Sequence, residues 1–152
     1  MSLIRLMAAV RTSVSPAADR DSVLDLAAGL LACRQVNQQQ LLAELHAREA
    51  VCSTAIGHGV AIPHGRCAGL SEPRGAMIRL PHAVDFGNNQ QVDLVFAMAV
   101  PAADTEHHLQ LLAALAQHFS DPKFRLALRQ AENADALLEL LSHSPSASES
   151  RA

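Results

Sequence analysis

The feature that most constrains the fold is the apolar run from Val92 to Val100. Apart from Asp93, every residue in the run is apolar, and Pro101 ends it. A strand with one face in water alternates apolar and polar residues, whereas a strand covered on both faces does not. We therefore expect this run to form the central strand of a sheet that has helices on both faces. The run is far below the ~20 residues that span a bilayer, so we expect no membrane insertion.

Helical patterns occur both before and after this strand in the sequence. Apolar residues recur at helical spacing between Asp21 and Gln35, and Asn37 with Gln40 resembles a capping box that opens a second helix. Two short strand-like runs lie within 53–66, and a further strand is expected over 75–80. Three helices are expected after Pro101, with N-caps at Thr105, Asp121 and Asn133. The order of helices, strands and helices predicts an α/β layer arrangement.

Composition and charge exclude several classes of protein. The chain has 152 residues, a formal net charge of −3 and neither Trp nor Tyr, so it lacks the basic surface and stacking rings of a nucleic-acid binder. The three cysteines form no CxxC pair, which suits reduced thiols, and the start lacks the long apolar region of a secretion signal. We expect a cytoplasmic protein with one domain over 1–141 and a disordered Ser-rich tail over 142–152.

His64 is the strongest candidate among the eight histidines. Pro63 fixes the backbone before it, and Gly65 permits an unusual dihedral or a close approach after it. A neutral imidazole is a nucleophile near pH 7 and can accept a phosphoryl group covalently. The alternative is a histidine that only hydrogen-bonds to a turn.

His108 is the second candidate. With Thr105 as N-cap it would be the third helical residue, where free backbone N–H groups attract anions and disfavour imidazolium. Its place on the apolar stripe equally fits a half-buried helix end. His58, between two glycines, could approach a ligand, but a spacer role fits it better.

The sequence does not support a zinc site or a nucleotide site. Four potential zinc ligands lie close together, but their spacing matches no usual zinc motif: Cys52, His58, His64 and Cys67. Gly57 and Gly59 lack the third glycine of a dinucleotide fingerprint, and no phosphate-loop motif is present. We expect neither a metal nor a cofactor.

A longer segment resembles a known family. Arg48-Glu49 followed by Ser-Thr-Ala-Ile-Gly-His-Gly-Val-Ala-Ile-Pro-His-Gly over 53–65 is similar to the active-site signature of enzyme IIA components of the bacterial phosphotransferase system, in the fructose, mannitol and nitrogen-regulatory branch. The similarity continues through 73–84 and 92–101 into His108-Leu109, and covers residues 20 to 141.

The resemblance implies a single domain with a mixed, roughly five-stranded sheet flanked by helices. It also implies that His64 is the phosphoacceptor and that His108 and Arg48 stabilise the phosphoryl group, with a small histidine phosphocarrier protein as donor. His58 stands where relatives often carry Asn, so the chemistry of this loop stays open.

Two destinations for the phosphoryl group stay open. A nitrogen-type regulator would report its phosphorylation state to target proteins, whereas a sugar-transport component would pass the group to a IIB domain. Because no IIB or membrane domain is attached to this sequence, we expect regulation. A decayed interaction module is a third interpretation, against which the intact trio of Arg48, His64 and His108 argues.

Overall fold

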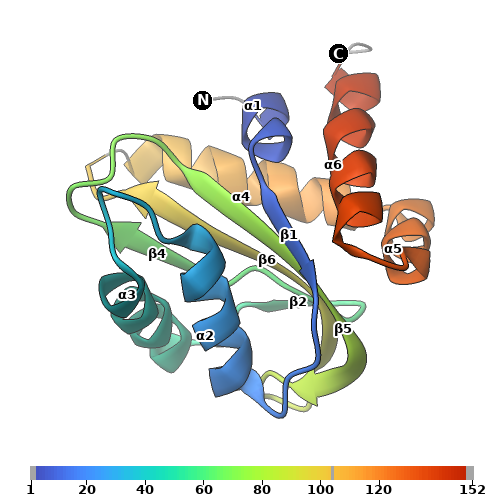
Figure 1. The fold of residues 1–152 in the computed structure, drawn as a ribbon, viewed down its shortest axis with the longest axis horizontal. Coiled ribbons are helices and arrows are strands. Elements are labelled where there is room, and N and C mark those ends of the chain that lie inside the picture. The colour runs from blue at the N-terminus through green and yellow to red at the C-terminus, as the bar shows by residue number, and fades with distance from the viewer. Residues whose placement is uncertain (1–2, 104, 150–152) are drawn as a thin grey trace.

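The fold consists of one sheet between two layers of helices (Figure 1). The computed structural model describes residues 3–103 and 105–149. In chain order the elements are α1 (Leu3–Ala8), β1 (Arg11–Val14), α2 (Arg20–Leu31), α3 (Gln38–Val51), β2 (Ala55–Gly57), β3 (Val60–Ala61), β4 (His64–Cys67), β5 (Arg74–Asp85), β6 (Gln91–Pro101), α4 (Thr105–Phe119), α5 (Pro122–Gln130) and α6 (Ala134–Glu149). The expected α/β class is confirmed.

The sheet is mixed and centres on β6. Its strand order is β1-β5-β6-β3-β2, and β4 also pairs with β6. β5 runs antiparallel to β6, whereas β3 and β4 both run parallel to it, one after the other along the same side. The sheet therefore has six strands in five positions, in agreement with the expected count.

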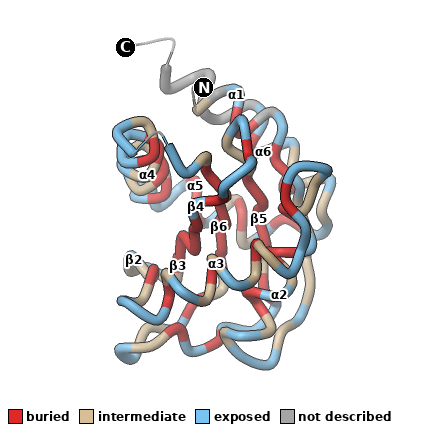
Figure 2. Tube along the Cα trace, turned by 90° about the vertical axis from the view of Figure 1, so that its left-hand side faces the viewer, coloured by how far each residue is buried: buried red, intermediate tan, exposed pale blue. Residues whose placement is uncertain are grey.

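Two cores form because β6 is apolar on both faces. Val95, Ala97 and Ala99 pack against α2 and α3, while Leu94, Phe96 and Met98 pack against α1 and the helices after β6. Figure 2 shows the buried residues concentrated along the strands between the helical layers. Successive side chains of a strand point to opposite faces, so alternate residues of β6 enter the two cores. This confirms the expected central strand with helices on both faces of the sheet.

Capping residues set the helix boundaries as expected at three sites. The side chain of Asn37 accepts a hydrogen bond from the Gln40 backbone N–H, and Asp121 caps α5, whose first residue is Pro122. The Asn133 side chain accepts from the Ala136 backbone N–H at the start of α6. These bonds satisfy N–H groups that have no partner within the helix.

Three details differ from the sequence expectations or extend them. α4 begins at Thr105 itself, so His108 is its fourth residue and not its third. The first twenty residues contribute α1 and β1, which the patterns did not predict, and β1 pairs in parallel with β5. α6 extends past residue 141, where the tail was expected to begin; residues 150–152 lie outside the described residues, and the domain boundary stays a prediction.

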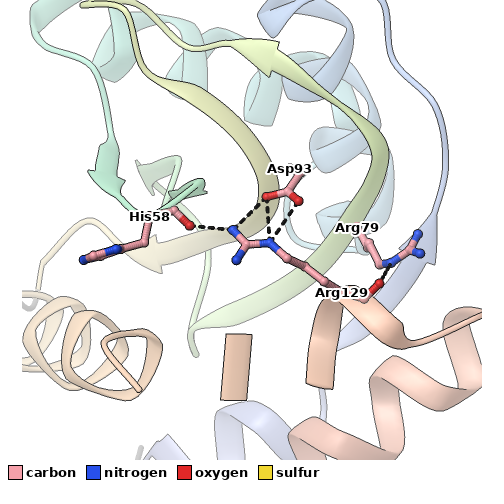
Figure 3. Close-up of polar contacts among 4 residues, drawn as sticks. All are labelled: His58, Arg79, Asp93 and Arg129. Atoms are coloured by element: carbon pink, nitrogen blue, oxygen red, sulfur yellow. Dashed lines mark hydrogen bonds and ion pairs between the residues drawn. The ribbon is translucent and has the colours of Figure 1, made fainter. Parts of the chain in front are cut away.

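Arg129 of α5 forms a hydrogen bond with the turn between β2 and β3 (Figure 3). Arg129 donates to both carboxylate oxygens of Asp93 and to the His58 carbonyl oxygen, and Arg79 donates to the Arg129 carbonyl oxygen. Gly57, His58 and Gly59 all have positive φ, a backbone region that residues other than glycine rarely adopt. The contacts of Arg129 therefore help to hold this turn. The His58 imidazole points away from the cluster, so its backbone carries the contact.

Among the helices that the structure describes, none has the length and apolar character needed to cross a membrane.

Candidate functional site

His64 lies where the edge of the sheet is interrupted. β3 ends at Ala61 and β4 begins at His64, with Ile62 and Pro63 between them. Pro63 has no N–H to give to a ladder, but its carbonyl oxygen accepts a hydrogen bond from Met98 of β6. The imidazole is therefore held at the start of a strand, and only 7% of the residue is exposed.

Two hydrogen bonds define the protonation of the His64 ring. Nδ1 lies 2.7 Å from the Ile62 carbonyl oxygen, which can only accept, so Nδ1 carries the hydrogen. Nε2 lies 3.2 Å from Nε of Arg48, which can only donate, so Nε2 holds the lone pair. Both partners select the same tautomer, which leaves the lone pair on Nε2.

Burial is the main reason why the His64 ring is neutral. Burial lowers the pKa of His64 below its ordinary value, and the Arg48 guanidinium lowers it further. The hydrogen bond to Ile62 and the Glu49 carboxylate oppose this shift without cancelling it. A neutral ring at pH 7 leaves Nε2 free of a proton, as nucleophilic attack requires.

Arg48 reaches His64 because α3 packs closely on β4. A Cβ on Gly65 would lie 2.8 Å from Cβ of Glu44 and 3.2 Å from its backbone carbon, so only glycine allows this approach. Arg48 also donates from Nη1 to the Cys52 carbonyl oxygen at 2.8 Å, which anchors the guanidinium at the end of α3. Gly65 therefore allows the close approach of α3 to β4, one of the two roles that the sequence suggested for this glycine.

His108 comes to the same place from α4. Its ring centroid is 5.2 Å from that of His64, and the two ring planes are 74° apart. The residue is 8% exposed, and its Nε2 has no hydrogen-bond partner among the residues that the structure describes. Burial, helped by His64, Arg66 and Arg48, lowers the pKa of His108 to about 4. The ring is neutral at pH 7 and has unused hydrogen-bonding capacity.

A cavity of about 500 Å³ opens beside these side chains. It lies between α3, β4 and α4, and its wall combines the polar groups with an apolar rim. The lining residues are Glu44, Ala47, Arg48, His64, Gly65, Arg66, Thr105, His108, Leu109 and Leu112. Leu109 is largely exposed, so the cavity adjoins an apolar surface at which a protein could dock.

The structure brings together all three residues proposed from the sequence, Arg48, His64 and His108. It also adds residues that sequence reasoning did not assign. Arg66 lines the cavity and donates to the Thr105 hydroxyl, while the buried Glu49 accepts from Thr54. Arg66 directly follows the Pro-His-Gly segment, and this position is the sequence signal that could have identified it.

The other candidates lie elsewhere. His58 does not line this cavity, and its carbonyl oxygen is bound by Arg129. His118, which the sequence did not mark as a candidate, packs on Phe124 with ring centroids 4.1 Å apart, and burial lowers its pKa. Over residues 3–103 and 105–149, no three His, Cys, Asp or Glu side chains are grouped so that they could hold a metal ion.

A nucleophilic imidazole, two guanidiniums and an apolar rim at one cavity are the parts that phosphoryl transfer between proteins needs, because such catalysis is mostly positioning and charge stabilisation. The site and fold thus define a class of phosphoryl-transfer domain. Residues 8–144 match the model of the family "Phosphoenolpyruvate-dependent sugar phosphotransferase system, EIIA 2", and the chain belongs to this family. It is a phosphoryl-transfer component of that system.

Proteins named as nitrogen regulatory proteins are similar to most of this chain. A "Nitrogen regulatory protein" of Pseudomonas aeruginosa is 37% identical over 130 residues, which are 83% of this chain and 84% of that protein. The crystal structure of Nitrogen Regulatory Protein IIA-Ntr from Neisseria meningitidis superposes with a TM-score of 0.81 at 30% identity, covering 91% and 98% of the two chains.

A second solved structure shares the fold alone. It is the complex of enzyme IIAMTL and phosphorylated enzyme IIBMTL from Escherichia coli, with a TM-score of 0.71 at 21% identity, covering 85% of this chain and 91% of that one.

Proposed function

We propose that this chain is a histidine phosphocarrier that accepts a phosphoryl group on Nε2 of His64 from a small histidine phosphocarrier protein and acts mainly as a nitrogen-type regulator in the cytoplasm. One observation carries the proposal. His64 presents its Nε2 lone pair beside the Arg48 guanidinium, and its other nitrogen is occupied by the Ile62 carbonyl. Nucleophile, tautomer and cation are therefore in place before the donor arrives.

The transfer needs no proton movement. Nε2 of His64 attacks the phosphorus, the bond from phosphorus to the donor's imidazole nitrogen breaks, and the donor ring leaves as neutral imidazole. Nδ1 of His64 keeps its hydrogen on the Ile62 carbonyl, so the phosphorylated ring is an imidazolium. Arg48 turns its N–H from Nε2 of His64 to a phosphoryl oxygen, and His108 donates Nε2–H to another phosphoryl oxygen.

Regulation is favoured by the kind of relatives found. The similar proteins include a nitrogen regulatory protein and the structure of IIA-Ntr, which covers nearly the whole chain. Phosphorylation adds about two negative charges to the mouth of the cavity, beside the exposed Leu109, and such a change alters protein docking. The alternative is transfer to a IIB domain for fructose- or mannitol-type sugar uptake, favoured by the fold shared with the IIAMTL component of the complex with IIBMTL.

The experiment is phosphorylation of the purified chain by phosphoenolpyruvate, enzyme I and the phosphocarrier protein. We expect one acid-labile phosphate per chain, located at His64 by mass spectrometry and at Nε2 by ³¹P NMR. Phosphorylated and unphosphorylated chains are then used as bait in the native cytosol. Regulation predicts that at least one target differs between the two states by about 1–3 kcal/mol in affinity. Equal recovery in both states, together with rapid transfer to a IIB domain, would favour sugar transport.

Arg48→Lys is expected to slow phosphorylation by about tenfold, since the variant loses part of one charge-assisted interaction. Arg48 uses Nε for His64 and Nη1 for the Cys52 carbonyl, and a single ammonium group cannot hold both positions. The measurement is the initial rate of labelling by the phosphorylated donor. The exposed Arg34, changed to Lys, is the matched control. Equal rates in both variants would show that transfer does not require the two-point geometry of the Arg48 guanidinium.

A further inference from the structure

Glu49 is a buried carboxylate with a defined set of partners. It follows Arg48 on α3 and is only 5% exposed, although glutamate rarely lies inside a protein. One carboxylate oxygen accepts the Thr54 backbone N–H at 2.8 Å, and the other accepts the Thr54 hydroxyl at 2.7 Å. Both oxygens therefore bind one residue, and the last turn of α3 is tied to the segment that enters β2.

The same segment is connected to the His64 ring. The Thr54 carbonyl oxygen accepts the Ile62 backbone N–H at 3.0 Å. The Ile62 carbonyl oxygen in turn accepts Nδ1–H of His64 at 2.7 Å. A continuous set of short contacts thus leads from the Glu49 carboxylate through Thr54 and Ile62 to the nitrogen that does not react.

We infer that Glu49 is a positioning residue for phosphoryl transfer: through Thr54 and Ile62 it holds the His64 proton on Nδ1, and its charge stabilises the imidazolium formed when Nε2 is phosphorylated. The inference rests on the proposed function for its second half only. The tautomer of the unphosphorylated ring is a property of the chain itself.

The neighbouring charges on α3 act on His64 in opposite directions. The Arg48 guanidinium lowers the pKa of His64 and favours the neutral ring that attacks, whereas the Glu49 carboxylate raises it and favours the cationic ring. After transfer the ring carries a positive charge, because Nδ1 keeps its hydrogen while Nε2 has gained a bond. The Arg48-Glu49 pair therefore supports both ends of the reaction.

The Glu49→Gln and Glu49→Ala variants separate geometry from charge. A glutamine can still accept the Thr54 N–H with its amide oxygen and donate to the Thr54 hydroxyl with its amide N–H. We expect Glu49→Gln to keep the tautomer, with a His64 pKa lower than in the wild type. Its phosphohistidine should hydrolyse about threefold faster or more, because the nearby negative charge is gone. Glu49→Ala should lose both effects.

The primary readout is the ¹⁵N chemical shift of both His64 ring nitrogens in the unphosphorylated chain. In the wild type we expect the Nδ1–H tautomer, and in Glu49→Ala a mixture of both tautomers with a labelling rate lowered about tenfold or more. Leu41→Ala, which removes a buried side chain from the same helix, is the control for destabilisation and should keep the wild-type shifts.

Two outcomes would overturn the inference. One is a wild-type tautomer in Glu49→Ala, with a loss of thermal stability like that of Leu41→Ala, which would make Glu49 a structural residue. The other is a Glu49→Gln phosphohistidine as long-lived as the wild type, which would remove the charge role. A wild-type chain that accepts no phosphate would instead defeat the proposed function, while the tautomer measurement would still test Glu49.

Discussion

A His64→Ala chain is expected to accept no phosphoryl group from the donor protein. The substitution removes the imidazole that meets an arginine at Nε2 and a carbonyl at Nδ1. His108 is not expected to replace it, because its Nε2 has no arginine partner among the described residues and α4 lacks the Pro-His-Gly presentation. The measurement is incorporation of labelled phosphate from phosphoenolpyruvate at saturating donor, followed by peptide mapping.

The control for this experiment is another histidine of the same signature. His58 is exposed, does not line the cavity and has a φ of 58°, a conformation that asparagine tolerates well. His58→Asn should therefore be labelled like the wild type. Normal labelling of His64→Ala would rule out His64 as the acceptor, and mapping would then show which histidine carries the phosphate.

Much of the fold was predictable because its signals are local. The apolar run over Val92–Val100 placed the central strand, and Asn37 and Asp121 placed two helix starts. β1 was missed because its four residues show no strand alternation; it becomes a strand by pairing with β5, more than sixty residues away. Such a contact follows from tertiary packing, which local propensity does not encode.

The site was predictable only in part for the same reason. The resemblance selected Arg48, His64 and His108, but the burial of Glu49 was missed. Glu49 lies on the same face of α3 as the buried Leu41 and Leu45, yet a glutamate is rarely buried, so the spacing alone did not predict it. The position of Arg66 in the cavity depends on how α4 packs beside β4. The pKa of His108 depends on burial by several elements, which a sequence pattern does not show.

His108→Ala is expected to slow phosphorylation of His64 by about 10²-fold without abolishing it, as for the loss of one stabilising donor to the transferred group. The unpartnered Nε2 of His108 is buried next to His64, and leaving such an atom without a partner costs about 1–3 kcal/mol. A phosphoryl oxygen would supply the missing partner, so the cost would be relieved only during transfer. The measurement is the single-turnover labelling rate, with the product mapped to His64.

The same variant has a second signature, in the pH dependence of folding stability, which tests whether His108 is buried as a neutral ring. The folded-state pKa of His108 is about 4, below the value of about 6.5 in an unfolded chain, so the unfolded chain binds its proton first as the pH falls. Folding stability is therefore lost progressively from about pH 6.5 down to about pH 4, by up to about 3 kcal/mol from this residue. His108→Ala should flatten that part of the curve, while the lowered pKa of His64 leaves a residual slope. Denaturant unfolding from pH 4 to pH 8 measures the free energy of unfolding of both chains. If the His108→Ala curve ran parallel to the wild-type curve, His108 would not be buried as a neutral ring. If the labelling rate were also unchanged, His108 would not be a partner of the phosphoryl group.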